Sequence, residues 1–325
     1  MKDTLSLKSR PNELQGISLY RNCTFQIEYS YANYTKKTTK MNRKFILICT
    51  VFLGLTMISC NKTKPQKANP GVADTTATVE KESTETTDPK GPKNSASVIY
   101  AKQQIPVLCY HRISNEHKGD YTVSPATFSA HMKVLHDSGY HSIQPAQLYD
   151  YLVYNKELPT KPILITFDDS RVEHSEIAAP AMEKNGFRGV FFIMTITYNK
   201  KNYMTKDQIA QLSKAGHTIG LHSWDHTMVI KYKEPADWKK EVADPKKKLE
   251  DIVGKPVEYW AYPNGVYDHK GAVELSKYFK LSFSLSTKRD SIVPLQTVRR
   301  IIVPDCKPER LLKSIRESFR KAKKA

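Results

Sequence analysis

The feature that most constrains the fold is an alternation of short apolar runs with amphipathic helical patterns between residues 105 and 285. The runs are rich in β-branched and aromatic side chains, as buried parallel strands are. They occupy residues 105–110, 163–167, 189–194, 218–221, 257–262 and 281–285. Helical patterns cover 125–138, 180–185, 205–215 and 238–253, and a glycine follows each. This order predicts an α/β fold with a parallel sheet, either open or closed into a barrel.

The chain is basic, with a formal net charge of +18 over 325 residues. Such a balance can indicate a nucleic acid, an anionic membrane or an acidic polymer as partner. The sequence has no nucleic-acid motif and no basic run interleaved with aromatic residues. We therefore expect no nucleic-acid partner, and we expect the protein to be a monomer.

Residues 41–60, MNRKFILICTVFLGLTMISC, resemble a bacterial lipoprotein signal. Arg43 and Lys44 precede an apolar run, 45–58, that is too short for an ordinary membrane-spanning helix. The pattern predicts that Cys60 is lipidated and anchors the protein to a bacterial membrane in the cell envelope, facing the periplasm or the surface. A buried core helix is the alternative interpretation.

The targeting segment divides the chain. Met41 can serve as a start, so we expect residues 1–40 to be an extension that is not translated or is disordered. Residues 61–98 are rich in Thr, Lys, Pro and Glu and poor in large apolar side chains, which predicts a disordered linker. We expect residues 99–325 to form the folded domain that carries the function.

Acidic and imidazole side chains directly follow two of the predicted strands. Asp168 and Asp169 come after 163–167, and His222 and His226 come after 218–221. The carboxyl ends of parallel strands meet at one edge of a sheet or barrel, where active sites form. Two imidazoles and one carboxylate would suit a divalent metal with an open coordination position, and the second carboxylate could accept a proton.

Three short motifs resemble those of the polysaccharide deacetylases, the NodB-homology proteins of carbohydrate esterase family 4. They are TFDDS at 166–170, HSWDH at 222–226 and AYPNG at 261–265. The opening PVLCYHRI, 106–113, is similar to that of the branch acting on exported poly-N-acetylglucosamine. The resemblance implies a distorted (β/α) barrel with fewer than eight strands.

The resemblance also implies roles for the residues of these motifs. Asp168 would be the general base, and Asp169, His222 and His226 would hold the metal. The metal would most often be Zn²⁺, with Co²⁺ or Ni²⁺ as alternatives. The backbone N–H of Asn264, directly after Pro263, would stabilise the oxyanion together with the metal.

Two departures from the family pattern concern proton transfer. Many members have an arginine where Ala261 stands, and there it pairs with the base; Arg300 in VRRIIVP could supply that charge from another strand. The family's late histidine acts as general acid, yet no histidine follows His269. The proton for the leaving amine would then come from His111, from the protonated base or from water.

Aromatic residues near the motifs are candidates for the substrate pocket. Trp224 could stack on a sugar ring or belong to the core. Trp260 and Tyr262 alternate along one predicted strand, and we expect one of them, Tyr262, to face the pocket.

These features predict a metal-dependent hydrolase that removes acetyl groups from N-acetylated sugars of a polysaccharide or oligosaccharide. An O-acetyl esterase acting on xylan or another glycan would use the same site on a different bond. A carbohydrate-binding protein with a decayed site is a third interpretation. The missing arginine and late histidine favour it, whereas the intact acidic and imidazole residues oppose it.

Overall fold

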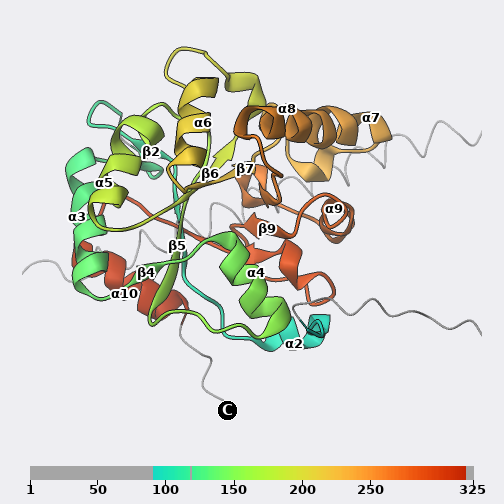
Figure 1. The fold of residues 1–325 in the computed structure, drawn as a ribbon, viewed down its shortest axis with the longest axis horizontal. Coiled ribbons are helices and arrows are strands. Elements are labelled where there is room, and N and C mark those ends of the chain that lie inside the picture. The colour runs from blue at the N-terminus through green and yellow to red at the C-terminus, as the bar shows by residue number, and fades with distance from the viewer. Residues whose placement is uncertain (1–90, 118, 320–325) are drawn as a thin grey trace, which may run out of the picture. The chain divides into compact units, whose positions relative to one another are not determined.

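A ring of parallel strands forms the centre of the computed structural model, which describes residues 91–117 and 119–319 (Figure 1). Its strand order is β10-β9-β8-β7-β6-β5-β1-β11. The strands of the ring are β1 (Val107–Tyr110), β5 (Pro162–Phe167), β6 (Val190–Ile193), β7 (Thr218–Leu221), β8 (Tyr259–Ala261), β9 (Leu281–Ser284), β10 (Val298–Arg299) and β11 (Ile301–Ile302). Off the ring, β4 (His141–Ser142) pairs with β5, and β2 (Arg112–Ile113) pairs with β3 (Thr122–Val123).

One extended segment closes the barrel. β10 and β11 are its two halves, separated by Arg300; β10 pairs with β9, whereas β11 pairs with β1. The backbone N–H of Arg300 donates to the Ser284 carbonyl, and that of Val303 donates to the Cys109 carbonyl. The eight strands of the ring therefore come from seven chain segments, and the prediction of a distorted (β/α) barrel is confirmed.

Helices surround the strands (Figure 1). Six of them pack buried apolar side chains on the outer face of the barrel: α3 (Pro125–Asp137), α5 (Ala179–Lys184), α6 (Lys206–Lys214), α8 (Asp244–Val253), α9 (His269–Leu275) and α10 (Pro308–Ser318). The other helices are α2 (Ala96–Ala101), α4 (Pro145–Tyr154) and α7 (Pro235–Trp238). Short helical turns complete the set: η1 (His174–Ala178), η2 (Thr195–Thr197), η3 (Val229–Lys231), η4 (Lys239–Ala243), η5 (Pro263–Gly265) and η6 (Pro294–Gln296).

Alternate residues of each strand enter two different apolar cores. Ile163, Ile165 and Phe167 of β5 join the outer core with α3 and α5, while Leu164 joins the inner core. Residues two apart on a strand share a face. Trp260 and Tyr262 accordingly both lie in the outer core, each 0% exposed. The prediction that Tyr262 lines the pocket is wrong for this reason.

Two prolines widen helices by one residue per turn. Pro180 and Pro245 lack a backbone N–H and would collide with the carbonyl four residues earlier in a regular α-helix. The chain adopts wide turns at η1 and η4 instead, in which the N–H of the sixth residue bonds to the carbonyl of the first. η1 merges with α5, so that helical segment begins at His174, earlier than the predicted 180. α7, η4 and α8 run on from one another, so the second segment begins at Pro235 and not at 238.

The other expected strands and helices agree with the structure to within a few residues. Helices α2, α4, α9 and α10 and the short strands β2, β3 and β4 were not expected. α2 includes residues 96–98, which the sequence places in the linker. Ser95 caps this helix, and Ile99 anchors it in the inner core. Among the described residues, no helix is long and apolar enough to cross a membrane. The targeting segment, Cys60 and most of the linker lie outside the described residues.

Candidate active site

The predicted site residues come together at the carboxyl ends of β5 and β7. Asp168 and Asp169 follow β5 directly, and His222 follows β7. Asp169 and His226 have left-handed backbones, with φ of 74° and 73°. Non-glycine residues in that region cost of order 1–3 kcal/mol and concentrate at functional sites. The left-handed turn at Asp169 separates the directions of the two neighbouring carboxylates.

Asp169, His222 and His226 form a compact group of potential metal ligands. Asp169 Oδ1 lies 3.6 Å from His222 Nε2 and 3.5 Å from His226 Nε2. A tetrahedral zinc ion with bonds of about 2.0–2.1 Å would place its ligand atoms roughly 3.3–3.4 Å apart. The three side chains therefore fit a divalent ion with little movement.

The protonation of His222 also suits metal binding. Its Nδ1 lies 2.7 Å from the carbonyl oxygen of Ala261. A carbonyl can only accept a hydrogen bond, so Nδ1 carries the proton and Nε2 presents its lone pair toward Asp169. This is the usual way in which proteins orient a ligating imidazole.

Asp168 faces the barrel interior, where Arg300 pairs with it through two hydrogen bonds. Arg300 Nη1 donates to Oδ1 over 2.7 Å, and Nη2 donates to Oδ2 over 2.8 Å. The Asp168 side chain is 2% exposed and that of Arg300 is 0% exposed. Burial alone would raise the pKa of Asp168, but Arg300 and His222 outweigh it and hold this pKa well below its ordinary value. Arg300 thus provides the charge that is absent at Ala261.

His111 lies on the other side of Asp168. Its Nε2 is 3.9 Å from Asp168 Oδ2, and its side chain is 14% exposed. Burial lowers the pKa of His111, and the nearby Asp168 carboxylate opposes that effect. The His111 backbone carbonyl accepts a hydrogen bond from His174 Nε2. His174 thus fixes the backbone of His111, whose imidazole is partly exposed and lies beside Asp168.

The remaining predicted residues lie around the carboxyl ends of β7 and β8. Trp224 is partly exposed, and the Lys240 ammonium sits 4.4 Å from its ring centroid. Asn264 is exposed and left-handed, with φ of 57°, directly after the buried Pro263. The structure places Asn264 at the turn that follows β8.

Three residues near the site were not predicted. Cys109 donates from Sγ to Asp168 Oδ2 over 3.5 Å, His174 holds His111, and Glu241 accepts from the backbone of Trp224. Strand alternation could have placed Cys109 beside Asp168, because residues 107, 109 and 111 share the inner side of β1. The positions of His174 and Glu241 depend on the wide turns η1 and η4.

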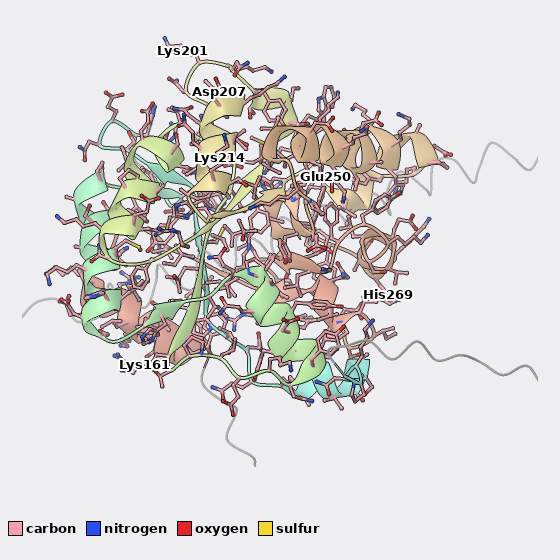
Figure 2. All side chains as sticks on the ribbon, in the orientation of Figure 1. Lys161, Lys201, Asp207, Lys214, Glu250 and His269 are labelled. Atoms are coloured by element: carbon pink, nitrogen blue, oxygen red, sulfur yellow. The ribbon has the colours of Figure 1, made fainter. Side chains whose placement is uncertain are left out.

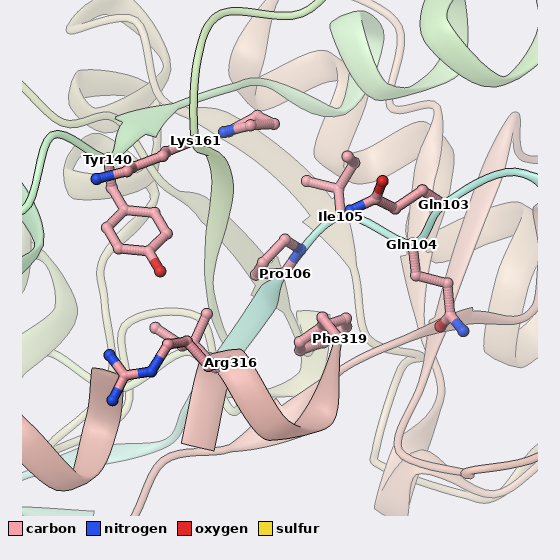
Figure 3. Close-up of a pocket in the computed structure, with 10 residues that line it drawn as sticks. Gln103, Gln104, Ile105, Pro106, Tyr140, Lys161, Arg316 and Phe319 are labelled. Carbon is pink, nitrogen blue, oxygen red and sulfur yellow. The ribbon is translucent and has the colours of Figure 1, made fainter. Parts of the chain in front are cut away.

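A cavity of about 420 Å³ lies at the opposite end of the barrel (Figure 3). It is lined by residues just before β1 and β4, at the start of β5, and in or just after α10: Gln103, Gln104, Ile105, Pro106, Tyr140, Lys161, Pro162, Ile315, Arg316 and Phe319. Figure 2 shows Lys161 at this end and Lys201, in the loop after β6, at the other. The cavity is thus remote from Asp168 and is not the candidate active site.

Comparison with known proteins points to one family. Residues 155–279 match the family model described as "Polysaccharide deacetylase". YxkH of Bacillus subtilis (strain 168), named as a polysaccharide deacetylase, is 30% identical over 167 residues, covering 51% of this chain and 59% of YxkH. A chitin deacetylase of Arthroderma benhamiae is 28% identical over 137 residues, covering 39% of this chain and 34% of that protein. The chain thus spans less than two thirds of either relative.

The barrel itself resembles solved structures. The Streptococcus pyogenes deacetylase PplD, solved in complex with acetate, superposes with a TM-score of 0.60 at 23% identity. The match covers 65% of this chain and 98% of PplD. At this identity the similarity shows the fold alone. The family model and the curated relatives, together with this fold, support the polysaccharide deacetylase family for the chain.

Proposed function

We propose that this protein is a metal-dependent N-deacetylase that removes acetyl groups from N-acetylated sugars of a polysaccharide. The observation that carries the proposal is that potential metal ligands and a potential proton acceptor lie together at one edge of the barrel. A group of three metal-ligating side chains adjoins a buried carboxylate that is kept ionised by Arg300. A decayed binding site would have no need to retain both.

The metal would be held by Asp169, His222 and His226, and Zn²⁺ suits their donor set, with Co²⁺ or Ni²⁺ as alternatives. When bound, it supplies Lewis acidity to the acetyl carbonyl and to water. The backbone N–H of Asn264 would donate to the oxygen of the acetyl group as negative charge develops there.

Asp168 would take the proton of the attacking water as the new carbon–oxygen bond forms. Its low pKa keeps it ionised across the neutral range, so the acceptor is always available. Breaking the carbon–nitrogen bond then requires a proton on the leaving amine. Two imidazoles of the described residues, those of His111 and His222, lie within 4 Å of Asp168. His222 belongs to the ligand group, so His111 would carry the proton from Asp168 to the nitrogen of the leaving amine. Acetate and a free amine are the products.

The substrate would be a β-linked N-acetylglucosamine polymer or its oligomers. The similarity of 106–113 to the branch acting on poly-N-acetylglucosamine supports this choice, as does the chitin deacetylase relative. Trp224 is partly exposed beside the ligand group and would offer a flat apolar surface to a sugar ring. The protein would act as a monomer attached to the cell envelope through lipid on Cys60.

Acetate release tests the proposal. The purified protein, loaded with Zn²⁺, is incubated with N-acetylated chito-oligosaccharides and, separately, with acetylated xylan. We expect acetate from the chito-oligosaccharides, and its loss after the ion is removed by a chelator. Release from xylan alone would establish an O-acetyl esterase, and no release from either would favour a binding protein.

A further inference from the structure

The loop that carries both imidazoles rests on the wide helical turn η4. This loop, residues 222–228, includes two left-handed residues, Ser223 with φ of 65° and His226 with φ of 73°. Inside the loop, the His226 N–H donates to Ser223 Oγ over 2.8 Å. Such a strained backbone persists only where the surrounding structure supports it. From outside the loop, the backbone N–H groups of Thr195 and Ile196 donate to the carbonyls of Ser223 and Trp224 over 3.4 and 2.9 Å. The side chains of residues 240 and 241 support the loop from the helical side.

Glu241 is a buried carboxylate that contacts the loop backbone. Its side chain is 3% exposed, and Oε2 accepts the backbone N–H of Trp224 over 3.3 Å. Trp224 lies midway between His222 and His226, and this side-chain contact adds to the hydrogen bond that the Trp224 carbonyl accepts from the backbone of Ile196. A glutamate is rarely buried unless it has partners of this kind.

Lys240 ties the same carboxylate to the loop from the outer side. Its ammonium lies 3.0 Å from Glu241 Oε1 and 3.8 Å from Asp225 Oδ2. The same ammonium sits over the Trp224 ring. Neighbouring residues of a regular helix diverge by about 100° around the axis. Here the side chains of both Lys240 and Glu241 reach the loop, Glu241 from the buried side and Lys240 from the surface.

Pro245 is the sequence cause of this geometry. Because Pro245 has no N–H, the Glu241 carbonyl cannot receive the usual α-helical hydrogen bond from it, and the chain forms η4 instead. The wide turn changes the helical phase between α7 and α8. Wide turns of this kind are frequent at functional sites, where they redirect a side chain.

We propose that Glu241 is a positioning residue that sets the separation of the metal ligands His222 and His226 by accepting the Trp224 N–H. The role requires a hydrogen-bond acceptor at the distance that a glutamate side chain reaches, and it does not require a negative charge. It rests on the metal site of the proposed function, although it does not require that the substrate is an N-acetylated sugar.

Three substitutions of Glu241 test the role through metal affinity. Glu241→Gln keeps the length and an acceptor oxygen, Glu241→Asp keeps the charge but shortens the reach, and Glu241→Leu removes the acceptor. Partners that orient metal ligands are typically worth 10- to 100-fold in affinity. We expect Zn²⁺ affinity to fall about 10- to 100-fold for Asp and Leu, and less than about threefold for Gln.

Glu250 provides a matched control on the same helix (Figure 2). Its Oε1 also accepts a backbone N–H, that of Val257 over 2.9 Å, but this contact lies away from the metal ligands. Glu250→Leu therefore removes a comparable hydrogen bond from α8. We expect the thermal stability of this variant to fall while its Zn²⁺ affinity stays unchanged.

The measurements are Zn²⁺ competition titration and the visible absorption spectrum of the Co²⁺-loaded full-length protein. The spectrum reports ligand geometry, which a general loss of stability does not change. An altered spectrum in Glu241→Asp with a normal one in Glu241→Gln supports the role. Unchanged affinity and spectra in both Glu241→Asp and Glu241→Leu overturn this inference alone. A wild-type protein that binds no divalent ion overturns the proposed metal site as well.

Discussion

Replacing Arg300 by methionine should move the acid limb of the pH–activity profile upward. Arg300 neutralises Asp168 through hydrogen bonds of 2.7 and 2.8 Å in a place where neither side chain is exposed by more than 2%. Two unit charges with centres about 4 Å apart interact by about 4 kcal/mol at an effective dielectric constant of about 20. A change of one pKa unit corresponds to about 1.4 kcal/mol. Loss of this interaction should therefore raise the pKa of Asp168, and with it the midpoint of the acid limb, by roughly two to three pH units.

The same substitution has a signed effect on stability. In the native protein the pKa of Asp168 lies below that of an aspartate in the unfolded chain. The ion pair with Arg300 therefore stabilises the fold fully at pH values above the unfolded pKa. This stabilisation is lost as the pH falls through the pKa of Asp168 in the folded protein. In Arg300→Met the carboxylate is buried without its partner, which should cost about 3–5 kcal/mol near neutral pH. This cost should shrink as the pH is lowered, because the carboxyl group then becomes neutral.

The assay is the pH dependence of kcat/KM for acetate release, with urea unfolding at pH 8 and pH 5 alongside. Arg299→Met is the control, because Arg299 lies on the same segment but donates to the Ser318 carbonyl, away from Asp168. Its acid limb should match that of the wild type. An acid limb that stays in place in Arg300→Met would refute the assigned role of Arg300.

Two further predictions concern proton delivery and the anchor. His111→Asn should slow hydrolysis of an N-acetyl sugar by about 100-fold or more, while an aryl acetate, whose leaving group needs no proton, should be affected far less; equal losses on both substrates would contradict the role of His111. Cys60→Ser should move the protein of a bacterial extract from the detergent phase to the aqueous phase, since no lipid could be attached; a variant that stays in the detergent phase would contradict lipidation at Cys60.

The sequence predicts those parts of the site that depend on local order along the chain. Asp168, Asp169 and His222 each follow an apolar run directly, and the ends of parallel strands must meet at one edge of a barrel. Their proximity therefore follows from the order of residues along the chain. The error at Tyr262 arose from applying strand alternation wrongly, since residues two apart point to the same side.

The remaining parts depend on long-range geometry. The sequence offered Arg300 as a possible partner of Asp168, but the pairing itself depends on one segment, β10 to β11, that closes the barrel between β9 and β1, and a sequence pattern does not give that register. Glu241 reaches Trp224 only because Pro245 widens the helix by one residue. A regular helical pattern places residue 241 in another direction, so this contact was not predictable.

The central claim assigns different tasks to the two neighbouring carboxylates, and one paired measurement tests it most directly. Bound Zn²⁺ per chain and the rate of acetate release are determined together for Asp168→Asn and Asp169→Asn. Asp168→Asn should keep the ion and lose about 100- to 10,000-fold in rate, because only the proton acceptor is removed. Asp169→Asn should lose ion and activity together. An Asp168→Asn protein that loses the ion while Asp169→Asn retains it would contradict the account.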